Sequence, residues 1–145
     1  MNEKRDPLDD IIVDEDQSMD RTLLAEMLKQ EVKITKQGEI CFDGKYHAYK
    51  QWEKIILYLL ARKVRAIKKI SNSKEGASLK EIEEGTMIPS KSVSRAFNHN
   101  LKGILKKDKS FYSIPNYNLS RCKLILEGKE KIPNLRKNKT SQGDT

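Results

Sequence analysis

Two cysteines and two histidines are the residues of this chain best suited to metal or redox chemistry. Cys41 and Cys122 lie far apart in the sequence, and neither has a CxxC partner. His47 and His99 do not form a recognised zinc-ligand spacing with either cysteine, so the sequence does not predict a zinc site. We therefore expect two ordinary thiols, kept reduced inside the cell, and no bound metal.

The acidic residues do not form an obvious catalytic pair either. Glu83 and Glu84 are adjacent, but neighbouring helix positions point in different directions, which makes a poor acid–base pair. The sequence contains no GxxxxGK[ST], no GxGxxG and no nucleophile motif. We do not predict an enzyme or a cofactor.

Charge gives the first positive indication of function. The chain has 145 residues, 34% of them charged, with a net charge of +8. Residues 1–20 hold eight acidic and two basic residues, which leaves 27 basic and 13 acidic residues in the remainder. The arm therefore carries −6 and the rest of the chain +14. So basic a body predicts a polyanionic partner, with nucleic acid as the first candidate.

The acidic arm contains an apolar triplet, Ile11 to Val13, enclosed by acidic residues. Three interpretations stay open: a flexible solvated tail, a docking segment that adds a strand to a partner's sheet edge, and a competitor with phosphate for the basic face. We predict an acidic flexible arm over 1–20 and a basic flexible tail over 129–145. No segment is apolar enough to cross a membrane, and no signal peptide is evident, so we expect a cytoplasmic, nucleoid-associated protein.

The elements that position functional residues begin after the arm. Residues 21–47 predict a helix, capped by Asp20, and a small hairpin that turns at Gln37-Gly38 and ends at Asp43-Gly44. From about Ala48 to Ile70, apolar residues recur at steps of three and four, which predicts an amphipathic helix roughly 35 Å long with its charges outside the core. So long a helix suggests that one end projects or pairs with a second subunit.

Residues 78–105 predict two consecutive helices. Ser78 and Glu81 form a capping box, which marks a helix start, and this helix ends near Gly85. Pro89 and Ser90 follow, with Ser90 as the expected cap of a second helix. The second helix has an apolar stripe of Val93, Ala96, Phe97, Leu101, Ile104 and Leu105.

This segment resembles a winged helix-turn-helix, a DNA-binding module common in prokaryotic and archaeal transcription regulators. The matching residues are Ser78, Glu81, Ile82, Ile88, Pro89, Val93, Ser94, Arg95 and Phe97. Glu83 departs from the small Ala that usually lets the helices approach, and Met87 departs from the usual turn Gly. After the helices, Leu105 to Ile114 predicts strand, polar turn and strand, which is the position of the wing. A last helix, capped by Asn118, stops at Gly128.

The resemblance implies an α+β fold, mostly helical, with the winged-helix domain over 48–128 and the helix and hairpin of 21–47 as an extension. It implies that the second helix enters the major groove. The expected base-reading residues are Ser90, Lys91, Ser92, Ser94, Arg95 and Asn98, because Arg pairs with guanine and Asn with adenine through two hydrogen bonds each. The expected phosphate contacts are His99, Lys102, Lys106, Lys107 and Lys109.

Three functional hypotheses follow. The first is a transcriptional regulator that binds double-stranded DNA, as a homodimer whose subunits meet through the long helix around Trp52 or through the extension. The second is a winged-helix adaptor that binds protein, with the acidic arm recruiting a partner. The third is a sequence-neutral chromatin or RNA binder that relies on its charge.

Overall fold

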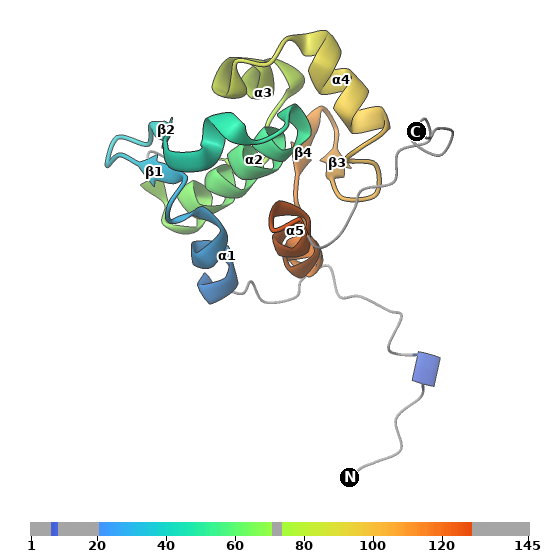
Figure 1. Cartoon of the computed structure of the whole chain (residues 1–145), viewed down its shortest axis with the longest axis horizontal. Coiled ribbons are helices and arrows are strands. Elements are labelled where there is room, and N and C mark those ends of the chain that lie inside the picture. The colour runs from blue at the N-terminus through green and yellow to red at the C-terminus, as the bar shows by residue number, and fades with distance from the viewer. Residues whose placement is uncertain (1–6, 9–20, 71–73, 129–145) are drawn as a thin grey trace.

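The computed structural model describes residues 7–8, 21–70 and 74–128 of the chain. These residues form an α+β fold of α-helices, short 3-10 helices and two antiparallel hairpins (Figure 1). In chain order the elements are α1 (Arg21–Leu28), β1 (Val32–Ile34), β2 (Ile40–Phe42), η2 (Gly44–Ala48), α2 (Gln51–Ile67), α3 (Leu79–Thr86), α4 (Ser90–Asn98), β3 (Lys106–Asp108), β4 (Phe111–Ser113), η4 (Asn116–Asn118) and α5 (Leu119–Leu126). The predicted arm, apart from residues 7–8, the predicted cap Asp20 and the predicted tail lie outside the described residues.

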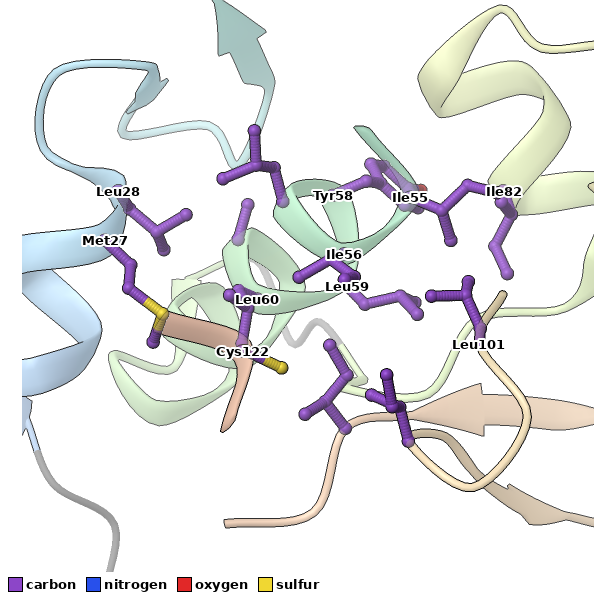
Figure 2. Packing of buried hydrophobic residues seen from close by; sticks show 14 of the residues in the cluster. Met27, Leu28, Ile55, Ile56, Tyr58, Leu59, Leu60, Ile82, Leu101 and Cys122 are labelled. Atoms are coloured by element: carbon purple, nitrogen blue, oxygen red, sulfur yellow. The ribbon is translucent and has the colours of Figure 1, made fainter. Parts of the chain in front are cut away.

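Helix α2 is the centre around which the other elements pack. It contacts α1, β1 and β2 on one side of the molecule and α3, α4 and β4 on the other (Figure 1). Nine successive residues, Ile55 to Lys63, are buried. Figure 2 shows Met27 and Leu28 from α1, Ile82 from α3 and Leu101 converging on this helix. The extension and the helix pair therefore share one apolar core.

The prediction for this central helix is wrong in length and in the placement of its charges. Ala48 belongs to η2, the chain at Tyr49 and Lys50 is extended, and the helix ends at Ile67, so α2 is roughly 25 Å long. Arg62 and Lys63 are only 5% and 4% exposed, although the amphipathic pattern predicts charges outside the core. The chain itself covers this buried segment, but Trp52, around which a dimer surface is predicted, precedes it and is half-buried.

Both predicted hairpins are present, and their registers are regular. Val32 pairs with Phe42 in the first hairpin, whose turn contains Gly38 at a φ of 97°. In the second hairpin Lys106 pairs with Ser113 and Asp108 with Phe111. Alternation of apolar and polar residues marks β1, whereas the three residues of β3 are all polar and exposed.

Helix α4 is shorter than its apolar stripe predicts. It ends at Asn98, and the amide of Leu101 donates to the Ala96 carbonyl at 2.8 Å, which turns the chain out of the helix. Leu101 and Ile104 are still buried, but they reach the core from the turn that follows. Burial therefore continues along the chain after the helical hydrogen bonds have stopped.

Two of the predicted caps differ from the structure. Pro89 is the N-cap of α4, and Ser90 is the first helical residue. Asn118 does precede α5, but its side-chain amide donates to the Ile104 carbonyl at 2.9 Å instead of capping that helix. The residue type therefore misplaces the cap of α4 by one residue, whereas for α5 the predicted cap position is right and only the side-chain bond differs.

Candidate nucleic-acid interface

A reciprocal pair of hydrogen bonds starts α3. The Glu81 amide donates to Ser78 Oγ at 3.1 Å, and the Ser78 amide donates to Glu81 Oε1 at 2.9 Å. This is the capping box that the sequence predicts, and it satisfies two backbone donors at the helix start. These two bonds define Ser78 as the N-cap of α3.

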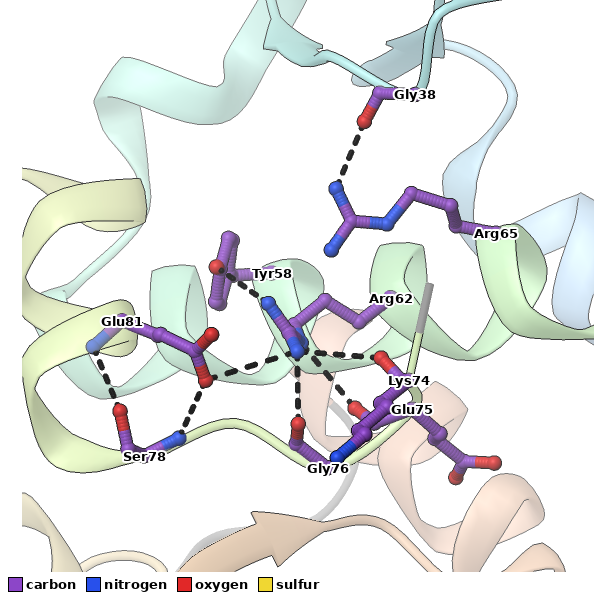
Figure 3. A network of polar contacts seen from close by, with 9 residues as sticks. All are labelled: Gly38, Tyr58, Arg62, Arg65, Lys74, Glu75, Gly76, Ser78 and Glu81. Carbon is purple, nitrogen blue, oxygen red and sulfur yellow. Dashed lines mark hydrogen bonds and ion pairs between the residues drawn. The ribbon is translucent and has the colours of Figure 1, made fainter. Parts of the chain in front are cut away.

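The buried Arg62 guanidinium joins this helix start to the centre of the molecule (Figure 3). It donates to the three carbonyl oxygens of residues 74–76 at 2.7–3.2 Å and to Tyr58 Oη at 3.1 Å. The Glu81 carboxylate lies 3.7 Å away. One guanidinium therefore satisfies a bend of backbone directly before α3 and balances the acidic residue of its capping box.

Neighbouring cations of α2 make similar attachments. Lys63 Nζ lies 2.7 Å from Glu75 Oε2 and donates to Asn116 Oδ1 at 2.8 Å, which links the bend before α3 to the segment after β4. Arg65 donates to the Gly38 carbonyl at 2.7 Å, which anchors the turn of the first hairpin. Burial lowers the pKa of Arg65, and the nearby Arg62 charge lowers it further.

The turn between α3 and α4 depends on a left-handed residue and a buried hydroxyl. Met87 has a φ of 63° at the end of α3, and its side chain is 86% exposed. Thr86 Oγ1 donates to the Ile82 carbonyl at 2.6 Å and accepts from the Ile88 amide at 3.3 Å. The turn thus forms without the glycine that the resemblance leads one to expect. Close packing comes instead at Gly85, where an added Cβ would overlap the ring of Tyr58.

Backbone pairing holds the second hairpin against the helix pair. The Ala77 amide donates to the Tyr112 carbonyl at 2.9 Å, and the Tyr112 amide donates to the Ala77 carbonyl at 2.8 Å. The Tyr112 ring packs on Phe97 of α4, with 4.4 Å between the ring centroids. The hairpin therefore has a fixed position beside α4.

Between α4 and the hairpin lies a groove of about 320 Å³. Its lining residues are Leu79, Ser94, Phe97, Asn98, Lys107 and Tyr112. Lys107 Nζ sits 5.6 Å from the centroid of the Tyr112 ring, a cation–π distance. Two aromatic rings, an amide, a hydroxyl and a cation therefore line the same groove.

The structure brings together Ser94, Asn98 and Lys107, three of the residues predicted to contact DNA. Ser90, Lys91, Arg95 and Asn98 are exposed, whereas Ser92 and Ser94 are half-buried. His99, Lys102, Lys106, Lys107 and Lys109 are all exposed, the first two beyond the end of α4 and the others on the hairpin. Arg95 does not line the groove, but it lies one helical turn from Lys91 and Asn98.

Sequence reasoning missed two residues and one contact that build this site. Arg62 was expected on a solvated face, Ala77 has no pattern that predicts a single pairing, and the contact of Phe97 with Tyr112 joins two predicted elements that the sequence does not place together. The opposite directions of Phe111 and Tyr112 are predicted by strand alternation: Phe111 is exposed, and Tyr112 is half-buried.

Neither a metal site nor a membrane span is seen in the described ranges. No three of their His, Cys, Asp and Glu side chains gather as a metal site needs. None of their helices has the length and apolar content to cross a bilayer. Comparison of the chain with protein-family models, curated proteins and solved structures yields no match.

Proposed function

We propose that this protein binds double-stranded DNA as a winged helix, with α4 in the major groove and the β3–β4 hairpin on the phosphate backbone. The observation that carries the proposal is the groove in which Ser94 and Asn98 of α4 meet Lys107 of the hairpin. A helix and a cationic hairpin fixed side by side can contact base edges and an adjacent phosphate at once.

The length and the side chains of α4 support its insertion into the major groove of DNA. Its nine residues span roughly 14 Å, and none of them is acidic. Lys91, Arg95 and Asn98 follow one another at steps of four and three, so they share one exposed face. Arg95 can donate two hydrogen bonds to guanine, and Asn98 can pair with adenine in the same way.

The hairpin supports a different type of contact. Lys106, Lys107 and Lys109 are exposed on a turn of few residues, with Asp108 as its single acidic residue. Lys109 has a φ of 59°, which sharpens the turn. Ammonium groups in this position would neutralise phosphates and hold the register of α4 without reading sequence.

The proposal is tested by comparing how tightly the chain binds two DNA duplexes of equal length. One is selected from a random pool, and the other is its scrambled version. Arg95→Ala should reduce the preference for the selected duplex by roughly 5- to 150-fold, because a two-bond contact discriminates by ~1–3 kcal/mol. Lys107→Ala should weaken binding of both duplexes equally and reduce the salt slope by about 0.9. Lys36→Ala, which removes the same charge from the turn of the first hairpin, should leave the preference unchanged.

Three outcomes would contradict the proposal. If the full chain binds neither duplex at low salt, the winged-helix adaptor becomes the better interpretation. If both duplexes bind equally with a steep salt slope, recognition is sequence-neutral. If Arg95→Ala and Lys36→Ala have the same effect, then α4 is not the reading element.

We further propose that two copies bind together on DNA. Both surfaces predicted for a dimer remain, because Trp52 precedes the buried segment of α2 and the extension also has exposed residues. Two modules on one symmetry axis would read half-sites about 10 base pairs apart. A selected site without twofold symmetry, together with a monomeric mass on DNA, would contradict this arrangement.

A further inference from the structure

A second groove, of about 470 Å³, lies on the far side of α2 from α3 and α4, between α1, β1 and the last turns of α2. Apolar side chains form its floor: Leu24, Leu28, Val32, Ile34, Val64 and Ile67. Such a surface is stabilised when another apolar group covers it. The proposed DNA-binding function does not use this groove.

Four exposed cations line the same groove: Arg21, Lys29, Lys33 and Lys68. No acidic residue lines it. Lys33 Nζ donates to the Lys29 carbonyl at 2.8 Å, but none of the four forms an ion pair within the described part of the chain. The groove therefore suits an occupant that combines apolar and acidic side chains.

Among the described residues only β2 pairs with β1, so the other edge of β1 has no strand beside it. The Thr35 amide donates to the Glu39 carbonyl, and the Asp43 amide donates to the Glu31 carbonyl, so the odd-numbered residues face β2. In an antiparallel ladder the alternate residues, here Val32 and Ile34, direct their amides and carbonyls to the opposite edge. Both of these residues line the groove. An extended segment could therefore add hydrogen bonds to its apolar contact.

The acidic arm has the complementary sequence. Ile11, Ile12 and Val13 are β-prone residues, preceded by two aspartates and followed by three acidic residues, Asp14 to Asp16. Only seven residues separate Val13 from Arg21, the first residue of α1 and a lining residue of the groove. Fully extended, this connection reaches roughly 26 Å, whereas α1 is only about 12 Å long.

We propose that the segment from Asp9 to Asp16 of the same chain docks in this groove, with its triplet on the apolar floor and its acidic residues beside the four cations. A short tether raises the effective concentration of the arm to the millimolar range, so the chain's own arm occupies the site ahead of a free acidic peptide. The arm then covers this groove and leaves the α4 face uncovered.

Methyl NMR spectra of the full chain test the proposal without DNA. Ile12→Asp places a charge in the centre of the triplet and should shift the signals of Leu24, Leu28 and Val32. The signals of Val93 and Leu101, beneath the α4 face, should stay unchanged. The matched control is Ile132→Asp, which makes the same substitution in the basic tail and should shift none of the groove signals.

Three results would overturn the proposal. Identical groove signals in the wild type and Ile12→Asp would mean that the arm does not occupy the groove. Shifts at Val93 and Leu101 instead would place the arm on the α4 face, in competition with phosphate. Groove signals of the wild type that change on 100-fold dilution would mean that the arm of a second copy is the occupant.

Discussion

At the scale of single residues, Arg62 shows how a buried charge can organise a small protein. Its guanidinium is satisfied by backbone carbonyls, by Tyr58 and by Glu81, so its desolvation is offset by several charge-assisted hydrogen bonds. Its planar fork suits this arrangement better than an ammonium would. The bend before α3 consequently has one position relative to α2.

Arg62→Leu should lower the free energy of unfolding by about 3 kcal/mol, because it leaves buried carbonyls and a hydroxyl without donors. Arg62→Lys should fall between this variant and the wild type. Urea denaturation followed by circular dichroism measures both. Lys80→Leu, at an exposed position of α3, is the control, and an equal loss there would contradict the role given to Arg62.

Tyr46 combines a well-packed ring with an unsatisfied hydroxyl. The ring stacks on Phe42 at 3.9 Å between centroids, and Lys54 Nζ lies 5.3 Å from its centre. Its buried Oη has no hydrogen-bond partner within the described residues. Burial raises the pKa of Tyr46 to about 12, because ionisation would place a charge in an apolar setting.

At pH 7 the free energy of unfolding of Tyr46→Phe should equal that of the wild type or exceed it by up to about 1 kcal/mol. In the wild type, the unfolded tyrosine loses its proton near pH 10, before the folded one does. The free energy of unfolding should therefore fall between pH 10 and 12, by about 1.4 kcal/mol per unit from this group. Urea titrations across this range should show a smaller fall in Tyr46→Phe than in Tyr117→Phe, the half-exposed control; equal falls would refute the assignment.

At the scale of elements, the turn between α3 and α4 stores backbone strain. A left-handed conformation costs a residue other than glycine roughly 1–2 kcal/mol, and the exposed Met87 side chain recovers little of it through packing. The two hydrogen bonds of the Thr86 hydroxyl stabilise this turn. The strain lies directly before the helix proposed to read DNA.

Met87→Gly should raise the free energy of unfolding by about 0.5–1 kcal/mol, because glycine adopts this conformation without strain. Thermal denaturation measures the effect. Glu84→Gly, within α3 itself, should instead destabilise the protein by about 1 kcal/mol. A loss of stability in Met87→Gly would show that the methionine side chain makes a contact more valuable than the strain it costs.

Elements with local signals can be predicted from this sequence, and elements fixed by distant contacts cannot. The hairpins and the Ser78–Glu81 capping box each depend on residues close in sequence. The Ala77–Tyr112 pairing joins residues far apart, and no single-sequence pattern marks it. The burial of Arg62 and Lys63 depends on partners from three other parts of the chain, which is why the periodicity of α2 misplaces them.

At the scale of the whole molecule, the N-terminal extension is packed into the core that supports the candidate interface. Leu24 is 3% exposed, and α1 contacts both α2 and α5. Glu26 Oε1 and Lys123 Nζ also join α1 to α5 across 3.1 Å. A continuous core of this kind favours unfolding in one cooperative step.

Leu24→Ala should therefore lower the stability of the whole molecule, by about 3 kcal/mol through lost burial and the cavity left behind. Trp52 fluorescence from α2 and circular dichroism from all helices should report one shared urea transition. Thr22→Ala, at an exposed position of α1, should leave that transition nearly unchanged. Two separated transitions would mean that the extension unfolds as an independent unit.

The two thiols differ in exposure, and their reactivities therefore report how often the core opens. Cys41 is exposed on β2, whereas Cys122 is fully buried among the residues that surround α2 (Figure 2). An alkylating reagent meets the first thiol directly and the second only in molecules that have transiently opened. In the native chain Cys41 can therefore be labelled selectively, and the alkylation rate of Cys122 measures how often the core opens.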